Sequence, residues 1–262
     1  MQIDLADRLY FEKTAAGGFS LTCNRPDIPT GDANLCYRAY QLLAAATPQR
    51  LNVRLHLEKN IPAGAGLGGG SSDAAVTLIA LNRLFELNLP NDRLFQFATQ
   101  LGSDVPFFLT GGLCRGRGRG EILEPLTNLP AFGILLIAPP VAISTAWAYQ
   151  NYNKLGLTKT EKCRKLPSSN IWQLQDDELA EVCRNDLEAA VFEKYKELAE
   201  IKAQLQRCGA VVASMSGSGA TMFGLFRTRQ EAQDRTKLFI YCNTFVAKPI
   251  EWGIPQVYQM QY

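Results

Sequence analysis

The chain has 262 residues, of which 47% are hydrophobic and 20% charged, and 27 basic against 25 acidic side chains leave a formal net charge of +2. A chain of this length buries roughly 70–75% of its unfolded surface without disulfide or metal staples, and its composition excludes general disorder. The small net charge argues against a nucleic-acid-binding protein with a strongly basic surface. It is compatible with binding of a phosphorylated small molecule.

The N-terminal residues, the apolar run and the cysteines indicate where in the cell the protein is expected. Residues 1–7 lack the cationic and apolar regions of a secretory signal, and the apolar run over 131–138 is too short to span a bilayer. The seven cysteines are scattered, form no Cys-x-x-Cys pair and are accompanied by a single histidine, which argues against structural zinc. We therefore expect a cytosolic protein with reduced thiols and with neither a membrane nor a nucleic-acid partner.

The first half of the chain mixes helices and strands. Alternating apolar and polar residues predict a half-buried strand over 51–58, with His56 on its polar face as a solvated residue. The stretch before it predicts a helix over 32–46 with Asp32 as its cap. The segments expected after the strand are a glycine-rich loop over 62–71, helices near 72–87 and over 91–101, and strands over 107–114 and 121–126.

The second half continues the mixture. Its expected segments are a strand over 132–138, a helix over 144–152, a polar surface loop over 155–170, two helical stretches within 177–207, strands over 211–214 and 222–226, a helix near 228–239 and a strand near 244–250. Strands and helices that mix without strict β-α-β alternation favour an α+β fold. Prolines cluster near 130–140, so we place the division between two domains there, with the domains covering 1–135 and 136–262.

The sharpest feature is the glycine-rich segment that follows the strand over 51–58. Glycine permits positive φ and lets backbone amides approach a ligand closely, and the next helix adds partial positive charge at its N-terminus. Together they predict an anion site, most naturally for phosphate groups, whereas a plain turn with a Ser or Asp helix cap is the alternative. The residues expected to bind phosphate are Pro62, Ala63, Gly64, Ala65, Gly66, Leu67, Gly68, Gly69, Gly70, Ser71 and Ser72.

Two common phosphate-binding loops fit this segment poorly. The P-loop requires a lysine after its last glycine, and no lysine lies between Asn60 and Asp73. The dinucleotide fingerprint is matched formally over 64–69. However, the acidic candidate about twenty residues later, Glu86, lies in a predicted helix rather than at the end of a second strand. Neither of these two loops therefore describes the segment.

Four segments, in the same order along the chain, resemble the sequence motifs of the GHMP kinase superfamily. They cover 62–75, 101–108, 185–188 and 215–221, and the first carries the run Gly-Gly-Gly-Ser-Ser-Asp. This run is similar to that of the branch of the superfamily that acts on cytidine diphosphate-linked methylerythritol. The resemblance implies a two-domain fold, with an N-terminal domain like ribosomal protein S5 domain 2 and a ferredoxin-like C-terminal domain.

The resemblance also implies a reaction and its participants. We expect ATP and Mg²⁺ as cofactors, and phosphorylation of the 2-hydroxyl group of a small-molecule substrate in the non-mevalonate isoprenoid pathway. The matching position of the general base is Asp104, for which a capping or turn role is the alternative. The positions that match substrate contacts are Thr145, Ser216, Gly217, Ser218 and Gly219, for which a helix cap and a hairpin turn are the alternatives.

The chain also departs from the family pattern. The family begins with a strand that carries Pro-Ala-Lys-Ile-Asn, whose Lys is a partner of the catalytic Asp, and continues with Asp-Gly-Tyr-His, which contacts the cytidine. Neither segment occurs here. The only histidine, His56, follows a leucine, so Asp-Gly-Tyr-His has no possible position in this sequence. We therefore expect an N-terminal domain that lacks its first strands, and weak or absent turnover. The open alternatives are a nucleotide-binding remnant without catalysis, another GHMP small-molecule kinase, and, for a plant source, a location in the plastid stroma.

Overall fold

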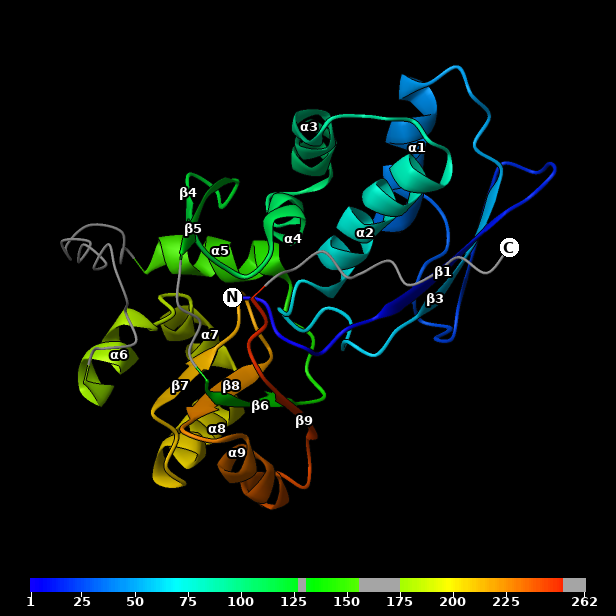
Figure 1. Cartoon of the computed structure of the whole chain (residues 1–262). Helices are drawn as coiled ribbons and strands as arrows, with labels where there is room; N and C mark the ends of the chain where they lie inside the picture. Colours follow the sequence, from blue (N-terminus) through cyan, green and yellow to red (C-terminus); the bar gives the residue numbers. More distant parts are fainter. Residues whose placement is uncertain (127–130, 156–174, 252–262) are drawn as a thin grey trace. The chain divides into compact units, whose positions relative to one another are not determined.

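The computed structural model describes residues 1–126, 131–155 and 175–251 (Figure 1). The chain forms two compact units. The first comprises Met1–Ala63, Gly68–Leu126 and the chain from Ile250, and the second comprises Gly64–Leu67 and Thr127–Pro249. Both contain helices and largely antiparallel sheets, so the fold class is α+β. The predicted surface loop lies outside the described residues except for Leu155.

A three-stranded sheet forms one side of the first unit, with strand order β1-β3-β2 (β1 Arg8–Lys13, β2 Phe19–Cys23, β3 Val53–Glu58). The central strand β3 alternates as the sequence predicts, because Val53, Leu55 and Leu57 are buried whereas Arg54 and His56 are exposed. It pairs antiparallel with β1 and parallel with β2. The alternation therefore gives the sheet one face toward the core and one polar face.

Four helices form the core of the unit, and the first two of them contact the sheet. They are α1 (Leu35–Ala46), α2 (Gly69–Leu84), α3 (Asn91–Leu101) and α4 (Val105–Thr110). Helices α1 and α2 pack side by side (Figure 1), and Leu43, Leu78 and Leu81 are fully buried in their contact region. The hairpin of β4 (Leu113–Arg117) and β5 (Ile122–Leu126) completes the unit.

Several predictions for the first unit were wrong. The strand expected over 107–114 is replaced up to Thr110 by α4, because Pro106 fits the first turn of a helix and the apolar side chains bury with helical spacing. The cap of α1 is Asn34 rather than Asp32, since Asn34 Oδ1 accepts the Cys36 amide at 2.8 Å. Strands β1 and β2 were not predicted, because each lies at a sheet edge and has few inward apolar residues.

The second unit has a four-stranded antiparallel sheet with the order β7-β8-β6-β9. All six residues of β6 are buried between two neighbouring strands, as expected for an apolar run. The strands are β6 (Gly133–Ala138), β7 (Val212–Met215), β8 (Met222–Phe226) and β9 (Asn243–Ala247). The helices are α5 (Thr145–Lys154), α6 (Asp176–Val182), α7 (Glu188–Lys194), α8 (Lys196–Arg207), α9 (Arg229–Arg235) and the short 3₁₀ helix η3 (Thr236–Leu238).

The helical stretch predicted over 177–207 differs from the structure in one respect. It contains three helices rather than two, because the Asn185 side chain forms a turn before α7 and Tyr195 leaves helical geometry at φ −111°, ψ 73°. The helix near 228–239 likewise ends at Arg235 and continues as η3. Within the described ranges, no helix is long and apolar enough to cross a membrane.

Candidate functional site

The glycine-rich loop has an alternating backbone conformation. Gly64, Gly66 and Gly68 have φ of 64°, 75° and 70°, whereas the residues between them, Ala65 and Leu67, do not have positive φ. Alternation of left-handed with ordinary backbone turns successive N–H groups toward one concave side, which is an anion-binding geometry. The glycines therefore serve the conformation that a phosphate-binding loop requires.

Helix α2 begins three residues earlier than predicted, within the glycine run. Its N-cap is Gly68, and no side chain caps it. The amide of Ser72 donates to the Gly68 carbonyl at 2.9 Å, and the Ser72 hydroxyl donates to the Gly69 carbonyl at 2.9 Å. The alternative of a Ser or Asp cap is therefore wrong. The amides of residues 69–71 precede the helical ladder, where an anionic ligand can accept them.

The first part of the loop packs closely on the turn between β7 and β8. The Ser216 hydroxyl donates to the Gly66 carbonyl at 2.8 Å, and the Thr221 amide donates to the Ala65 carbonyl at 3.2 Å. A Cβ at Gly66 would lie 2.3 Å from the Ser216 carbonyl oxygen and 2.8 Å from that of Gly219. The loop and the turn are thus backbone-to-backbone neighbours within the second unit.

This contact predicts unequal effects of alanine at two glycines with similar φ. Gly64→Ala should lower the free energy of unfolding by about 1–2 kcal/mol, the cost of a left-handed residue with a Cβ, because its added methyl group has no non-adjacent described residue within 4 Å. Gly66→Ala should cost clearly more, because it adds the steric conflict with Ser216 and Gly219. Urea unfolding of both variants tests this, and equal losses would contradict the close contact.

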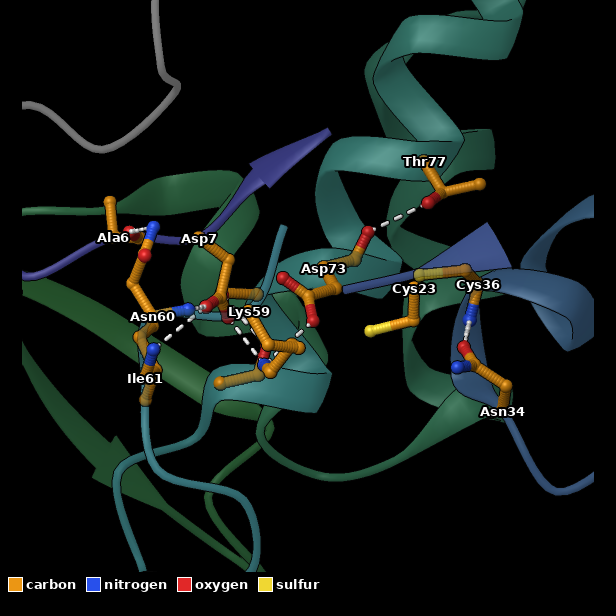
Figure 2. Close-up of polar contacts among 12 residues, drawn as sticks. Ala6, Asp7, Cys23, Asn34, Cys36, Lys59, Asn60, Ile61, Asp73 and Thr77 are labelled. Atoms are coloured by element: carbon orange, nitrogen blue, oxygen red, sulfur yellow. Dashed lines mark hydrogen bonds and ion pairs between the residues drawn. The ribbon is translucent and has the colours of Figure 1, made fainter. Parts of the chain in front are cut away.

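A buried ionic cluster lies beneath the start of α2 (Figure 2). This cluster, here called the Lys59 cluster, consists of Lys59, Asp7 and Asp73, and the three side chains are 4%, 1% and 4% exposed. Lys59 Nζ donates to Asp73 Oδ2 at 3.0 Å and also to Asp7. Asp7 Oδ1 accepts the amides of Asn60 and Ile61 at 2.6 and 2.8 Å. The cluster therefore joins the N-terminal segment, the start of the loop and α2.

Neither Lys59 nor Asp7 belongs to a predicted site, although the sequence carries one signal for Lys59. The buried positions of β3 are 53, 55 and 57, so residue 59 continues the buried phase of the same alternation. A lysine at a buried position requires an acidic partner. Asp7 and Asp73 are two such partners, so the cluster has one positive charge for two carboxyl groups.

Burial and charge imbalance determine the protonation of the cluster. Burial raises the pKa of Asp73 to about 7, and the neighbouring Asp7 charge adds to this rise against the attraction of Lys59. Burial alone would lower the pKa of Lys59, but the attraction of Asp73 and Asp7 outweighs it, so the net shift is upward. Asp73 Oδ1 has no hydrogen-bond partner among the described residues. The cluster thus accommodates a proton on Asp73 near neutral pH.

This shift predicts a pH dependence of stability. Because the folded pKa of Asp73 lies above the unfolded one, the folded state binds more protons between about pH 4 and 7, and stability falls as pH rises through that window. The slope is at most about 1.4 kcal/mol per pH unit. We expect the unfolding free energy of the unsubstituted chain, minus that of Asp73→Asn, to decrease from pH 5 to pH 8. A pH-independent difference, measured by urea unfolding, would contradict the assignment.

Asp104 lies at the N-cap position of α4, between α3 and α4 of the first unit. Its side chain is exposed and makes no hydrogen bond to the helix amides, with φ −88° and ψ −18° rather than the extended geometry of a capping residue. A side-chain capping role therefore does not account for this aspartate. An exposed carboxylate at a helix start is accessible for proton transfer.

The predicted substrate contacts of the second unit lie close together. Thr145 Oγ1 and Ser218 Oγ form a hydrogen bond of 2.8 Å, although they are 73 positions apart in the chain. The cap of α5 is Ser144, whose hydroxyl accepts the Trp147 amide, so Thr145 is not the capping residue. Ser216, Gly217, Ser218 and Gly219 form the turn between β7 and β8. The hairpin alternative for this turn is correct, and it is compatible with a binding role.

Comparisons with known proteins agree with this architecture. The GHMP kinases N terminal domain matches residues 34–112, and the GHMP kinases C terminal domain matches residues 169–238. A protein of Pelotomaculum thermopropionicum named 4-diphosphocytidyl-2-C-methyl-D-erythritol kinase is 43% identical over 88% of this chain and 80% of its own length. A protein of the same name from a Synechococcus strain is 42% identical over 85% of this chain and 74% of its own length.

Solved structures give the same result. A crystal structure of 4-(cytidine 5'-diphospho)-2C-methyl-D-erythritol kinase has a TM-score of 0.76 and 35% identity, and the match covers 94% of this chain and 86% of that one. Homoserine kinase from Cytophaga hutchinsonii also has a TM-score of 0.76, but at 17% identity it shows the fold alone. The chain therefore belongs to the GHMP kinase superfamily and, within it, to the 4-diphosphocytidyl-2-C-methyl-D-erythritol kinase family.

Proposed function

We propose that this chain transfers the γ-phosphoryl group of ATP to the 2-hydroxyl group of 4-diphosphocytidyl-2-C-methyl-D-erythritol, a step of the non-mevalonate isoprenoid pathway. Family membership supports the reaction class, since relatives at 40–43% identity carry this enzyme's name. The observation that carries the proposal is the glycine-rich loop with alternating positive φ that runs into the uncapped N-terminus of α2.

In this proposal the loop over 62–72 binds the ATP phosphates. Its backbone amides and the N-terminus of α2 supply donors and partial positive charge, and the half-buried Ser71 follows them in the first turn of α2. Phosphoryl transfer depends mainly on positioning and on neutralising charge spread over the equatorial oxygens. Fixed amides serve this purpose because they need no reorganisation during the reaction.

Asp104 is proposed as the general base. Its carboxylate accepts the proton of the acceptor hydroxyl while that oxygen forms a bond to the γ-phosphorus and the bond from the γ-phosphorus to the β,γ-bridging oxygen breaks. The products are the phosphorylated acceptor and ADP, with the proton on Asp104. Thr145 and the turn of Ser216–Gly219 are proposed to contact the acceptor, because their hydroxyls and backbone lie together on one unit.

Mg²⁺ is proposed as the accompanying ion. Among the residues that the structure describes, no three His, Cys, Asp or Glu side chains come together as a metal site. In kinases Mg²⁺ commonly keeps several waters and is bound through nucleotide phosphates and one or two protein carboxylates. When bound, it neutralises phosphate charge.

The proposed function is tested with a substrate panel. ATP binding is measured by calorimetry, and ADP release is measured with ATP and Mg²⁺ in the presence of 4-diphosphocytidyl-2-C-methyl-D-erythritol, homoserine or mevalonate. We expect ATP binding, and ADP release that depends on the first acceptor. ADP release that depends on another acceptor would assign a different substrate, and ATP binding without any release would favour a nucleotide-binding protein.

A further inference from the structure

Side chains of the Asn-Asp-Leu-Glu motif at residues 185–188 form hydrogen bonds with the turn between β7 and β8 and with the end of β7. Asn185 Nδ2 donates to the carbonyl oxygens of Met215 and Gly217, both at 2.7 Å. Its Oδ1 accepts the Leu187 amide at 3.0 Å. Both ends of one amide side chain are therefore engaged, and two carbonyls of a turn about thirty positions away are fixed by it.

Glu188 holds the end of β7, the strand that leads into the same turn. Its side chain is 9% exposed, and Oε1 accepts the Met215 amide at 2.8 Å and the Ser214 hydroxyl at 2.9 Å. Lys202 on α8 donates to Oε2. Both backbone polar groups of Met215 are thus bound by side chains of the motif. The Glu188 carboxylate accepts from the Met215 amide, the Ser214 hydroxyl and Lys202. It therefore fixes the backbone at Met215, because the loss of any of these bonds would leave a buried polar group unsatisfied.

The turn between β7 and β8 also contacts the glycine-rich loop. Ser216 Oγ donates to the Gly66 carbonyl and the Thr221 amide donates to the Ala65 carbonyl, within the same unit as the motif. A Cβ added to Gly217 would lie 3.2 Å from the Gly66 carbonyl oxygen. Because the two backbones are in contact, a displaced turn must displace residues 65 and 66.

We propose that Asn185 and Glu188 are positioning residues for nucleotide binding: they lock the turn over 215–219, and the locked turn holds loop residues 64–67 in the ATP-binding conformation. Neither residue touches the nucleotide in this account. The inference rests on the proposed function for its link to ATP, but the structural coupling stands on the contacts alone. A merely structural role would lower stability without changing either ATP affinity or the order of the loop.

The variant that tests this is Asn185→Asp. It keeps the acceptor for the Leu187 amide and the size of the side chain, but it replaces the donor to Met215 and Gly217 with a carboxylate oxygen. The matched control is Thr228→Ala, which removes the side-chain cap of α9 in the same unit, where the Thr228 hydroxyl accepts the Glu231 amide. Both variants are compared at a temperature where circular dichroism shows them folded.

Two readouts are measured. Calorimetry should show ATP binding at least about tenfold weaker in Asn185→Asp and unchanged within about twofold in Thr228→Ala. Hydrogen exchange of the ligand-free chain should show the Thr221 amide, which donates to Ala65, exchanging at least about tenfold faster in Asn185→Asp only. Unchanged exchange in Asn185→Asp overturns the inference.

The outcomes also separate the inference from the proposed function. Faster Thr221 exchange together with unchanged ATP affinity would overturn the link from the loop to nucleotide binding. No ATP binding by the unsubstituted chain would contradict the proposed function, while the exchange measurement would still decide the coupling of Asn185 to the loop. If Asn185→Asp fails to fold, Glu188→Gln, which keeps one acceptor oxygen, is measured in its place with the same expected directions.

Discussion

Asp104→Asn is expected to lower turnover with 4-diphosphocytidyl-2-C-methyl-D-erythritol by about 10²–10⁴-fold and to leave ATP affinity within about twofold of the unsubstituted chain. The amide has the shape of the carboxylate but cannot accept the hydroxyl proton. Because the Asp104 side chain is exposed and makes no bond to α4, its replacement should change stability little. Rates are measured by ADP release, and affinity is measured by calorimetry.

Asp92→Asn is the matched control for this variant. Asp92 is an exposed acid in the first turn of α3, so its replacement removes the same charge at a nearby helix start in the same unit. Its expected cost is about 0.3–1 kcal/mol of helix stability, with unchanged turnover. Similar turnover in Asp104→Asn and the unsubstituted chain would remove Asp104 from the role of general base.

Lys59→Met should be strongly destabilising, with a loss of about 3–5 kcal/mol in the free energy of unfolding. Methionine has a similar length, but without the ammonium group Asp7 and Asp73 remain as two buried carboxyl groups with no cation between them. The loss arises from this uncompensated burial rather than from a cavity. Urea unfolding at pH 7 measures it.

Two further variants identify the cause of that loss. Arg54→Met removes an exposed ion pair between β3, the strand that ends just before Lys59, and Glu12 on β1. The two side chains are 58% and 66% exposed, and the substitution should cost less than about 1 kcal/mol. Lys59→Met combined with Asp73→Asn should recover part of the loss, because one buried carboxyl group is removed together with the cation. A double variant as unstable as the sum of the two single ones would contradict the charge explanation.

Local sequence patterns were sufficient to predict the elements whose apolar residues recur with a clear period or whose composition is distinctive. The alternation over 51–58 predicted β3, the apolar run over 132–138 predicted β6, and the glycine-rich segment predicted the loop before α2. These features depend on side-chain spacing and on glycine φ, and both are readable from sequence. The boundaries were less accurate, since Gly69 and Gly70 are helical despite their low helix propensity.

The predictions that failed depended on tertiary contacts. Residues 105–110 have an apolar composition that fits a strand or a helix, and only their packing against α2 and α3 selects the helix. Strands β1 and β2 depend on pairing with β3, which lies thirty or more positions later in the chain. The contacts of Lys59 with Asp7 and of Asn185 with Met215 are also long-range, so sequence spacing alone could not reveal them.

The central claim, phosphoryl transfer by this chain, is tested most directly by a single-turnover experiment with enzyme in excess over γ-labelled ATP. Because enzyme exceeds ATP, each labelled nucleotide can bind, and a single transfer is detected even when turnover is slow. The account predicts that the label moves to 4-diphosphocytidyl-2-C-methyl-D-erythritol and that phosphorus NMR places it on the 2-hydroxyl group. Bound ATP whose label never leaves the nucleotide or reaches this acceptor would contradict the account.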